Sequence, residues 1–96
     1  MDWTNIYQSR IVSPLDAVRA AVKPGHRIFL TGNVSVPQKV LAALVEYAPN
    51  LHDVEICQAL TIGPADYVTP GIEKHMRVNT LFISHNVRKA VHEGRA

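Results

Sequence analysis

The stretch RIFLTGNVSVPQKVLAALVEYAPNLHDVEIC, residues 27–57, decides the fold class. It opens with a short apolar run at 27–31 and closes with another around 54–57, and each run is typical of a strand buried in a sheet. Between the two runs, apolar residues recur at helical spacing: Val40, Leu41, Leu44, Val45 and Ala48. A strand, a helix and a strand within roughly 30 residues form a βαβ unit, in which the strands are parallel. We therefore predict an α/β domain whose parallel sheet is flanked by helices.

The segments on either side extend this pattern. Before it, apolar spacing predicts a short helix over 3–10, and a second helix begins where Ser13 caps and Pro14 takes the first turn. After it, the apolar run 80–84 predicts a third strand, with Asn86 capping a final helix. A parallel sheet this small does not usually stand alone, because helices normally cover both of its faces. The sequence thus predicts an incomplete sheet, the first half of a larger one.

Composition narrows the class of protein. The chain has 96 residues, 47% of them hydrophobic, which suits a folded domain or part of one. Its net charge of +2 comes without any run of like charge, so we expect no nucleic-acid partner. Cys57 is the single cysteine, which excludes an internal disulfide. The start resembles no signal peptide, and no apolar stretch approaches the ~18 residues of a membrane span. We expect a soluble, cytoplasmic protein with no membrane partner.

One loop is a candidate ligand site. It follows the first strand, at the end where open α/β sheets bind ligands, and precedes a helix whose free N–H groups suit a carboxylate, phosphate or thioester oxygen. Its candidate binding residues are Gly32, Asn33, Val34, Ser35 and Pro37. Ser35 is expected to cap that helix, with Gln38 at the third helical position. A single glycine makes neither a dinucleotide fingerprint nor a P-loop, so a plain strand-to-helix turn is the alternative interpretation.

The reactive side chains do not form a catalytic or metal-binding pattern. The five histidines make no i,i+4 pair and do not stand at ligand spacing from Cys57, so no metal site is predicted. Cys57 ends an apolar strand and is interpreted as a small buried hydrophobe. The glutamates form no close carboxylate pair of the kind that acid–base catalysis uses. The residues alone indicate a ligand loop and no catalytic residue.

Several stretches, taken in order, carry a resemblance to a known family. They are WTNIYQSRIVS at 3–13, PGHRI at 24–28, the loop 32–37 and DVEI at 53–56. The most specific is HMRVNTLFISHNVR at 75–88, which AVHEGRA continues to residue 96 after Lys89. The family pattern there reads like H-F-R-x-N-x-L-F-x-G-x-N-x-R-x-A-V-x-x-G-R-A. Together these stretches resemble the N-terminal domain of the acetyl-CoA hydrolase/transferase family, which includes acetate and 4-hydroxybutyrate CoA-transferases.

The resemblance implies that residues 1–96 are the N-terminal part of a CoA-transferase α/β domain. It implies transfer of CoA between an acyl-CoA and a small carboxylate, through a glutamyl-CoA intermediate whose glutamate lies outside this chain. Glu46, Glu55, Glu73 and Glu93 stand in no matching motif, so no catalytic residue is carried over. The loop 32–37 would line the acyl or carboxylate side of the cleft, with Asn86 and Arg88 supporting the same rim. The CoA thioester is a substrate, and no permanently bound cofactor is expected.

The remaining partners follow from the incomplete sheet. We expect it to pair with the remainder of a CoA-transferase chain or with a second copy of itself, and we expect the 96 residues alone to be inactive. Two alternatives stay open. One is a non-catalytic remnant or interaction module that pairs with itself or another chain. The other is a small phosphosugar- or nucleotide-binding α/β module, because fold does not fix function. The sequence does not choose between transfer and hydrolysis or name the carboxylate.

Overall fold

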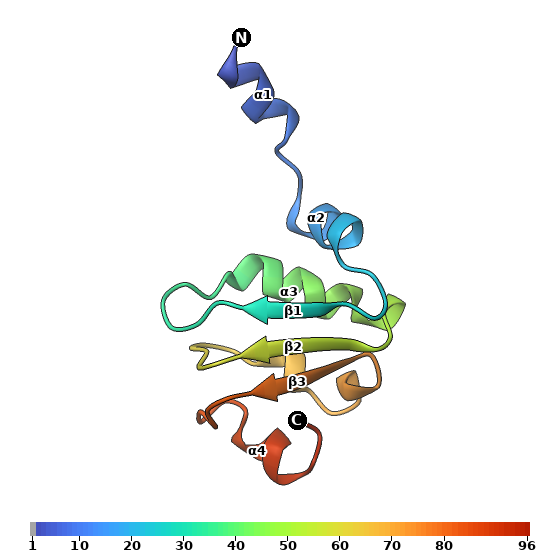
Figure 1. The fold of residues 1–96 in the computed structure, drawn as a ribbon, viewed down its shortest axis with the longest axis vertical. Helices are drawn as coiled ribbons and strands as arrows, with labels where there is room; N and C mark the ends of the chain where they lie inside the picture. The colour runs from blue at the N-terminus through green and yellow to red at the C-terminus, as the bar shows by residue number, and fades with distance from the viewer. Residues whose placement is uncertain (1) are drawn as a thin grey trace.

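A three-stranded parallel sheet organises the chain (Figure 1). The computed structural model describes residues 2–96. In chain order the elements are α1 (Trp3–Ser9), α2 (Pro14–Ala21), β1 (Arg27–Leu30), α3 (Gln38–Tyr47), η1 (Ala48–Asn50), β2 (Val54–Gln58), η2 (Asp66–Val68), η3 (Ile72–Lys74), β3 (Met76–Thr80) and α4 (Arg88–His92). The predicted α/β class and its βαβ unit are confirmed.

The strands lie in the order β1-β2-β3, and both pairings are parallel. Phe29 on β1 stands opposite Cys57 on β2, which stands opposite Asn79 on β3. Because side chains alternate between faces along a strand, these residues share one face, while Leu30, Ile56 and Val78 belong to the other. All strands also point the same way, so their carboxyl ends meet at one edge of the sheet (Figure 1).

One face of the sheet is the core. Ile56, at its centre, has no exposed surface, and Leu30 and Val78 beside it are buried. Leu41 and Leu44 on α3 belong to the same apolar cluster. The helix α2 packs against α3, and its Val18 joins the cluster. Ser13 caps α2 as predicted, accepting a hydrogen bond from the backbone N–H of Asp16 at 3.1 Å.

The opposite face of the sheet, which we call the bare face, carries Arg27 and Phe29, Glu55 and Cys57, and Arg77 and Asn79. Phe29 is 70% exposed, and the other five are exposed or half-buried. Within the described residues, α4 and the chain end approach this face at its β3 edge, and η3 borders its amino end. Cys57 was predicted to be a small buried hydrophobe and is only half-buried, because its side chain lies on the same face as Phe29 and Asn79, away from the core. An uncovered face is unusual for parallel strands.

The third strand lies earlier than predicted. The sequence favoured residues 80–84, whereas β3 is Met76–Thr80 and pairs with β2 from Val54 to Gln58. Met76 and Val78 are buried and alternate with exposed Arg77 and Asn79, which is the pattern of a strand with one covered face. The continuous apolar run at 81–83 follows the strand and is exposed. Continuity of apolar residues was the wrong signal for this sheet.

The helix α1 stands away from the rest of the chain (Figure 1). Asp2 caps it by accepting from the N–H of Thr4 at 2.9 Å, and the predicted helix over 3–10 is confirmed. None of its residues is buried, and Trp3 and Tyr7 are largely exposed. The apolar side chains of α1 are therefore not covered by any other part of the described residues. Among residues 2–96, no helix is both long and apolar enough to cross a membrane.

Candidate ligand-binding end of the sheet

Three segments meet where the strands end: 31–37 after β1, 59–63 after β2 and 81–86 after β3. Backbone contacts join them, because Asn33 donates its N–H to the carbonyl of Leu60 at 2.9 Å and Phe82 donates to that of Ala59 at 3.2 Å. They enclose a hollow of about 350 Å³ lined by Asn33, Leu60, Thr61, Ile62, Gly63, Ser84, His85 and Asn86. Open α/β sheets bind ligands at this end. The hollow's size falls within the range of small-molecule pockets.

Gly32 and Asn33 fix the first of these segments. A side chain at Gly32 would overlap the backbone carbonyl of Leu60, so the segments after β1 and β2 approach as closely as only glycine permits. Asn33 adopts a positive φ of 53°, a conformation that Asn tolerates better than most residues. Asn33 also pairs with Thr61 through an isolated parallel bridge. The glycine is thus needed for packing between two loops, whatever it does for a ligand.

Asn86 links the third segment to the second. Its side-chain amide donates to the carbonyl oxygens of Thr61 and Gly63 at 3.3 Å and 3.1 Å, and its oxygen accepts from the Ser84 hydroxyl. The prediction that Asn86 caps the last helix is wrong, since Val87 holds the N-cap position of α4 and no side chain caps it. Asn86 satisfies the backbone of a distant loop, and this defines the rim of the hollow.

A buried polar cluster supports this end from below. The Tyr67 hydroxyl donates to the side-chain oxygen of Gln58 at 2.9 Å and shares a 2.6 Å hydrogen bond with the Thr61 hydroxyl. Tyr67 and Gln58 are each 1% exposed. Burial raises the pKa of Tyr67, although its two hydrogen bonds oppose that shift. The cluster is fully hydrogen-bonded, and such networks hold one arrangement.

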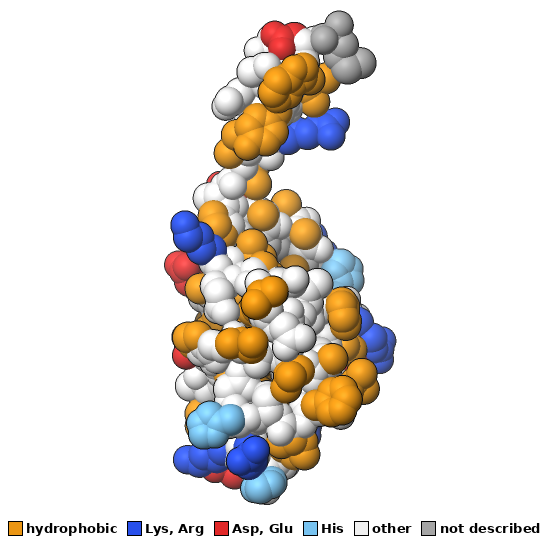
Figure 2. Space-filling model, turned by 90° about the vertical axis from the view of Figure 1, so that its left-hand side faces the viewer, with side chains coloured by type: hydrophobic (Ala, Val, Ile, Leu, Met, Phe, Trp, Pro, Cys, Tyr) orange, Lys and Arg blue, Asp and Glu red, His pale blue; other side chains and the backbone are white. Residues whose placement is uncertain are grey.

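Apolar side chains surround the hollow on the surface. Figure 2 looks onto the end of the molecule where the strands terminate and shows hydrophobic side chains scattered across it. The exposed large ones near this end are Val34, Leu60, Ile62, Leu81, Phe82 and Ile83. Val34 is 97% exposed at the tip of its loop. Exposed apolar surface of this kind, interrupted by polar groups, is typical of a ligand groove or an interface.

The structure brings some predicted site residues together and separates others. Gly32, Asn33, Val34, Ser35 and Pro37 lie on one loop at this end, and of these Asn33 lines the hollow, together with Asn86. Ser35 does not cap α3: Pro37 holds the N-cap position, and the Ser35 carbonyl accepts from the Thr31 hydroxyl at 2.7 Å. Arg88 lines a separate hollow on α4 with His85, Lys89, His92 and Glu93.

The sequence predicts no site residue in the segment 59–63. The segment receives hydrogen bonds from Asn33, from Asn86 and from the Gln38 side chain on α3. Gln38 reaches the carbonyl of Ile62 at 3.0 Å. The signal was available, since the segment follows a buried strand and ends at Gly63-Pro64.

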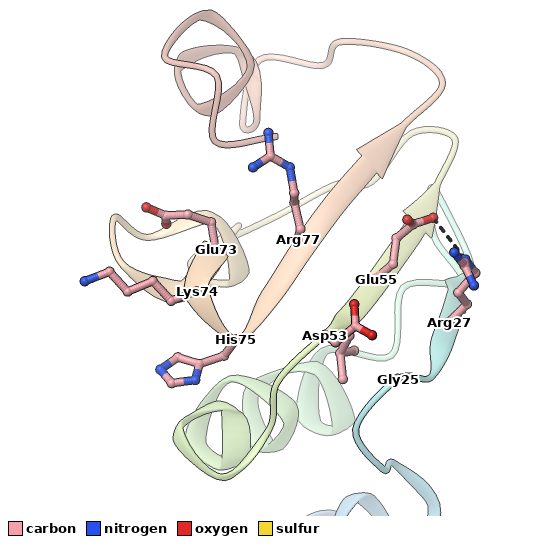
Figure 3. Close-up of a pocket in the computed structure, with 9 residues that line it drawn as sticks. Gly25, Arg27, Asp53, Glu55, Glu73, Lys74, His75 and Arg77 are labelled. Carbon is pink, nitrogen blue, oxygen red and sulfur yellow. Dashed lines mark ion pairs between the residues drawn. The ribbon is translucent and has the colours of Figure 1, made fainter.

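The other end of the sheet carries charge. A hollow of about 260 Å³ lies at the amino ends of the strands. In Figure 3, Arg27, Glu55 and Arg77 rise from neighbouring strands, and Lys74 and His75 lie across from Arg27 and Glu55. Arg27 and Glu55 form an ion pair at 3.8 Å. Hydrogen bonds from Cys57 and Asn79, together with the Arg27 charge, hold the pKa of Glu55 below its ordinary value, although desolvation opposes them. The same Glu55 bond raises the pKa of Cys57, which makes its thiol a weak nucleophile.

This amino-end hollow is a weaker candidate for the ligand site. Positive and negative groups alternate around it, so it presents no single charge to a ligand. It also lies at the end of the strands where α/β sheets do not usually bind substrates. Across residues 2–96, no three metal-binding side chains gather into a possible metal site. The carboxyl end of the sheet is therefore the candidate functional site.

The fold and this site define a class: an open parallel α/β domain with its ligand end formed by three strand-terminal loops. The chain belongs to the acetyl-CoA hydrolase/transferase family and corresponds to its N-terminal domain, whose family model matches residues 1–96. The chain is 31% identical over 96 residues to the 4-hydroxybutyrate coenzyme A transferase of Clostridium kluyveri, and 36% identical over 77 residues to a succinyl-CoA:acetate/propanoyl-CoA:succinate CoA transferase of Fasciola hepatica.

A solved structure agrees with the fold. RipA from Yersinia pestis superposes with a TM-score of 0.78 over 98% of this chain and 23% of that protein, at 17% identity. The match with the Clostridium protein covers all of this chain and 22% of that protein, and the match with the Fasciola protein covers 78% of this chain and 16% of that protein. The chain therefore spans about a fifth of the length of these relatives. The predicted resemblance and fold class are confirmed.

Proposed function

We propose that this chain supplies the N-terminal part of a CoA-transferase that moves CoA between an acyl-CoA and a small carboxylate of the acetate or 4-hydroxybutyrate type. The observation that carries the proposal is the family match over the whole chain, combined with an apolar-rimmed hollow at the ligand end of its sheet. Both of these relatives are named as CoA transferases, one of 4-hydroxybutyrate and one acting between succinyl-CoA and acetate and between propanoyl-CoA and succinate. CoA thioesters and carboxylates are the substrates that follow.

In the complete enzyme, the reaction is carried by the side-chain carboxylate of a glutamate that lies outside these residues. That carboxylate attacks the acyl carbon of the thioester, the C–S bond breaks, and CoA leaves as a thiolate from an acyl-glutamyl anhydride. The thiolate then attacks the glutamyl carbon, and the first carboxylate leaves as a glutamyl-CoA thioester forms. A second carboxylate reverses these two steps and departs as the new acyl-CoA. Covalent catalysis of this kind divides one difficult displacement into easier ones.

In this enzyme, the role of residues 1–96 is to bind substrate at one side of the cleft and to keep water from it. The loop 32–37 lines the acyl or carboxylate side of the cleft, with Asn33 as a polar contact and Val34 as an apolar one. Asn86 holds the 61–63 segment beside that loop, so it positions the rim. Arg88 takes a more distant supporting place on α4.

The test is an exchange reaction. Residues 1–96 are joined to the part of the Clostridium kluyveri transferase that follows its matched region, and this fused protein is incubated with acetyl-CoA and isotopically labelled acetate. We expect label in acetyl-CoA, together with an intact-mass increase of one CoA on the protein. The isolated chain should give neither, and the Clostridium part without its own N-terminal region is the matched control. Exchange by the isolated chain, or none by a folded fused protein, would contradict the proposal.

A further inference from the structure

The bare face of the sheet is too apolar at one end to be a water-facing surface. Phe29 is 70% exposed and has Cys57 as its cross-strand neighbour, so an aromatic ring and a thiol lie side by side with little above them. Parallel strands are normally covered on both faces. The amino half of the same face differs, because Arg27 and Glu55 are already paired there. A covering element thus meets apolar groups toward the carboxyl end and a neutralised ion pair toward the amino end.

The described chain ends beside this face. Ala96 and Val91 line a hollow of about 420 Å³ together with Glu55, Arg77 and Asn79 of the bare face. Arg77 donates to the carbonyl of Gly94 at 2.7 Å, and Arg95 donates to that of Val68 while pairing with Glu93 at 2.8 Å. These contacts fix the position of the last residues at the β3 edge. Any polypeptide joined at Ala96 starts next to the uncovered side chains.

We infer that the bare face is an interface for the part of a family member that follows this N-terminal domain, and that Phe29 is its apolar anchor. The inference rests on the proposed function, because that function supplies the occupant. The matched relatives are several times longer than the region they share with this chain, so ample polypeptide exists to cover the face. The occupant is an amphipathic segment with an apolar stripe for Phe29 and polar groups over Arg27 and Glu55.

The reactivity of the Cys57 thiol reports whether the bare face is covered, because Cys57 is the only cysteine of these 96 residues and lies on that face. Its modification by a maleimide is followed by mass spectrometry of the peptide that contains it, in the isolated chain and in the fused protein. We expect modification in the fused protein to be slower by about tenfold or more, since a covered thiol reacts only when the interface opens. Equal rates in the two proteins would overturn the inference.

Two matched variants separate the interface from general stability. Phe29→Glu is expected to restore fast modification of Cys57 in the fused protein while leaving the thermal midpoint of the isolated chain unchanged. Val34→Glu places the same charge on another exposed apolar residue, 97% exposed but on the 32–37 loop, and is expected to leave Cys57 protected. If both variants, or neither, restored modification, Phe29 would not be the anchor of this interface.

Three further results would separate the interface from the alternatives. Should the fused protein fail to fold, the same modification is measured on a mixture of the two separate chains, and Cys57 left equally reactive there would overturn the inference. Protection that appears in the isolated chain as its concentration rises would assign the face to a second copy and also overturn it. A fused protein that protects Cys57 yet performs no exchange would keep the interface and refute the proposed function.

Discussion

The two ends of the sheet are built from different chemistry, although the same three strands reach both. At the amino ends, the lining groups are mostly charged side chains that are exposed or half-buried, and Arg27 and Glu55 on neighbouring strands form an ion pair at 3.8 Å. At the carboxyl ends, short loops are tied together by backbone contacts and by buried hydroxyl and amide groups. Exposed ion pairs contribute little to stability, whereas buried polar groups are costly to disturb. We therefore expect the carboxyl end to be the more rigid end.

The largest effect should come from Gly32→Ala. The added methyl group would overlap the backbone carbonyl of Leu60, so the loops after β1 and β2 must separate. We expect a loss of about 1–3 kcal/mol in the free energy of unfolding, the usual cost of overpacking. Urea unfolding followed by circular dichroism measures it. Val34→Ala on the same loop is the control and should change nothing; a stable Gly32→Ala protein would show that the loops are free to move apart.

Tyr67→Phe comes next. It removes the hydroxyl that Gln58 and Thr61 both bond, and leaves the buried Gln58 oxygen without its donor. We expect a loss of about 1–2 kcal/mol, within the cost of leaving a buried polar group unsatisfied. Tyr7→Phe on α1, where the ring is exposed, is the matched control and should leave the urea midpoint in place. Equal behaviour of the two variants would mean that the buried cluster contributes nothing to the rigid end.

The sequence predicts an interaction at either end of the sheet best when the two partners lie close together in the chain. The Ser13 cap of α2 was predictable because donor and acceptor are three residues apart. The bonds of Asn86 to Thr61 span 25 residues, so a local rule assigned Asn86 to the nearest helix end instead. The exposed run Leu81–Ile83 misled the placement of β3, since apolar continuity normally marks a covered strand. The loop 32–37 was found because its place after a strand is a topological rule. The roles of its residues toward a ligand stay predictions.

Asn86→Ala should have a smaller effect than the first two changes. Its amide bridges to the Thr61 and Gly63 carbonyls, but the site is only half-buried, so water replaces part of what is lost. We expect about 0.5–1.5 kcal/mol, the net worth of an ordinary hydrogen bond. Hydrogen exchange resolved by residue gives the sharper reading, with faster exchange confined to segment 59–63. Asn5→Ala on the exposed helix α1 is the control, and faster exchange throughout the sheet would contradict a local role for Asn86.

At the amino end, Glu55→Gln should lower stability slightly at neutral pH and reduce the dependence of stability on acid. Contacts from Cys57, Asn79 and Arg27 lower the pKa of Glu55 in the folded chain. A carboxyl with a lowered pKa contributes its stability above the ordinary pKa of the unfolded chain, and loses it as the pH falls through the lowered value. Urea midpoints in acid and at neutral pH should therefore lie closer together in the variant than in the parent chain.

The same change should release the Cys57 thiol, whose pKa the Glu55 hydrogen bond raises. Alkylation at a fixed, mildly alkaline pH should be faster in Glu55→Gln, because a larger fraction of the thiol is ionised. This is the smallest effect in energy, and it depends on the single hydrogen bond between Cys57 and Glu55. If Glu55→Gln destabilised the chain at neutral pH as strongly as Tyr67→Phe does, the contrast between a solvated charged end and a rigid polar end would fail.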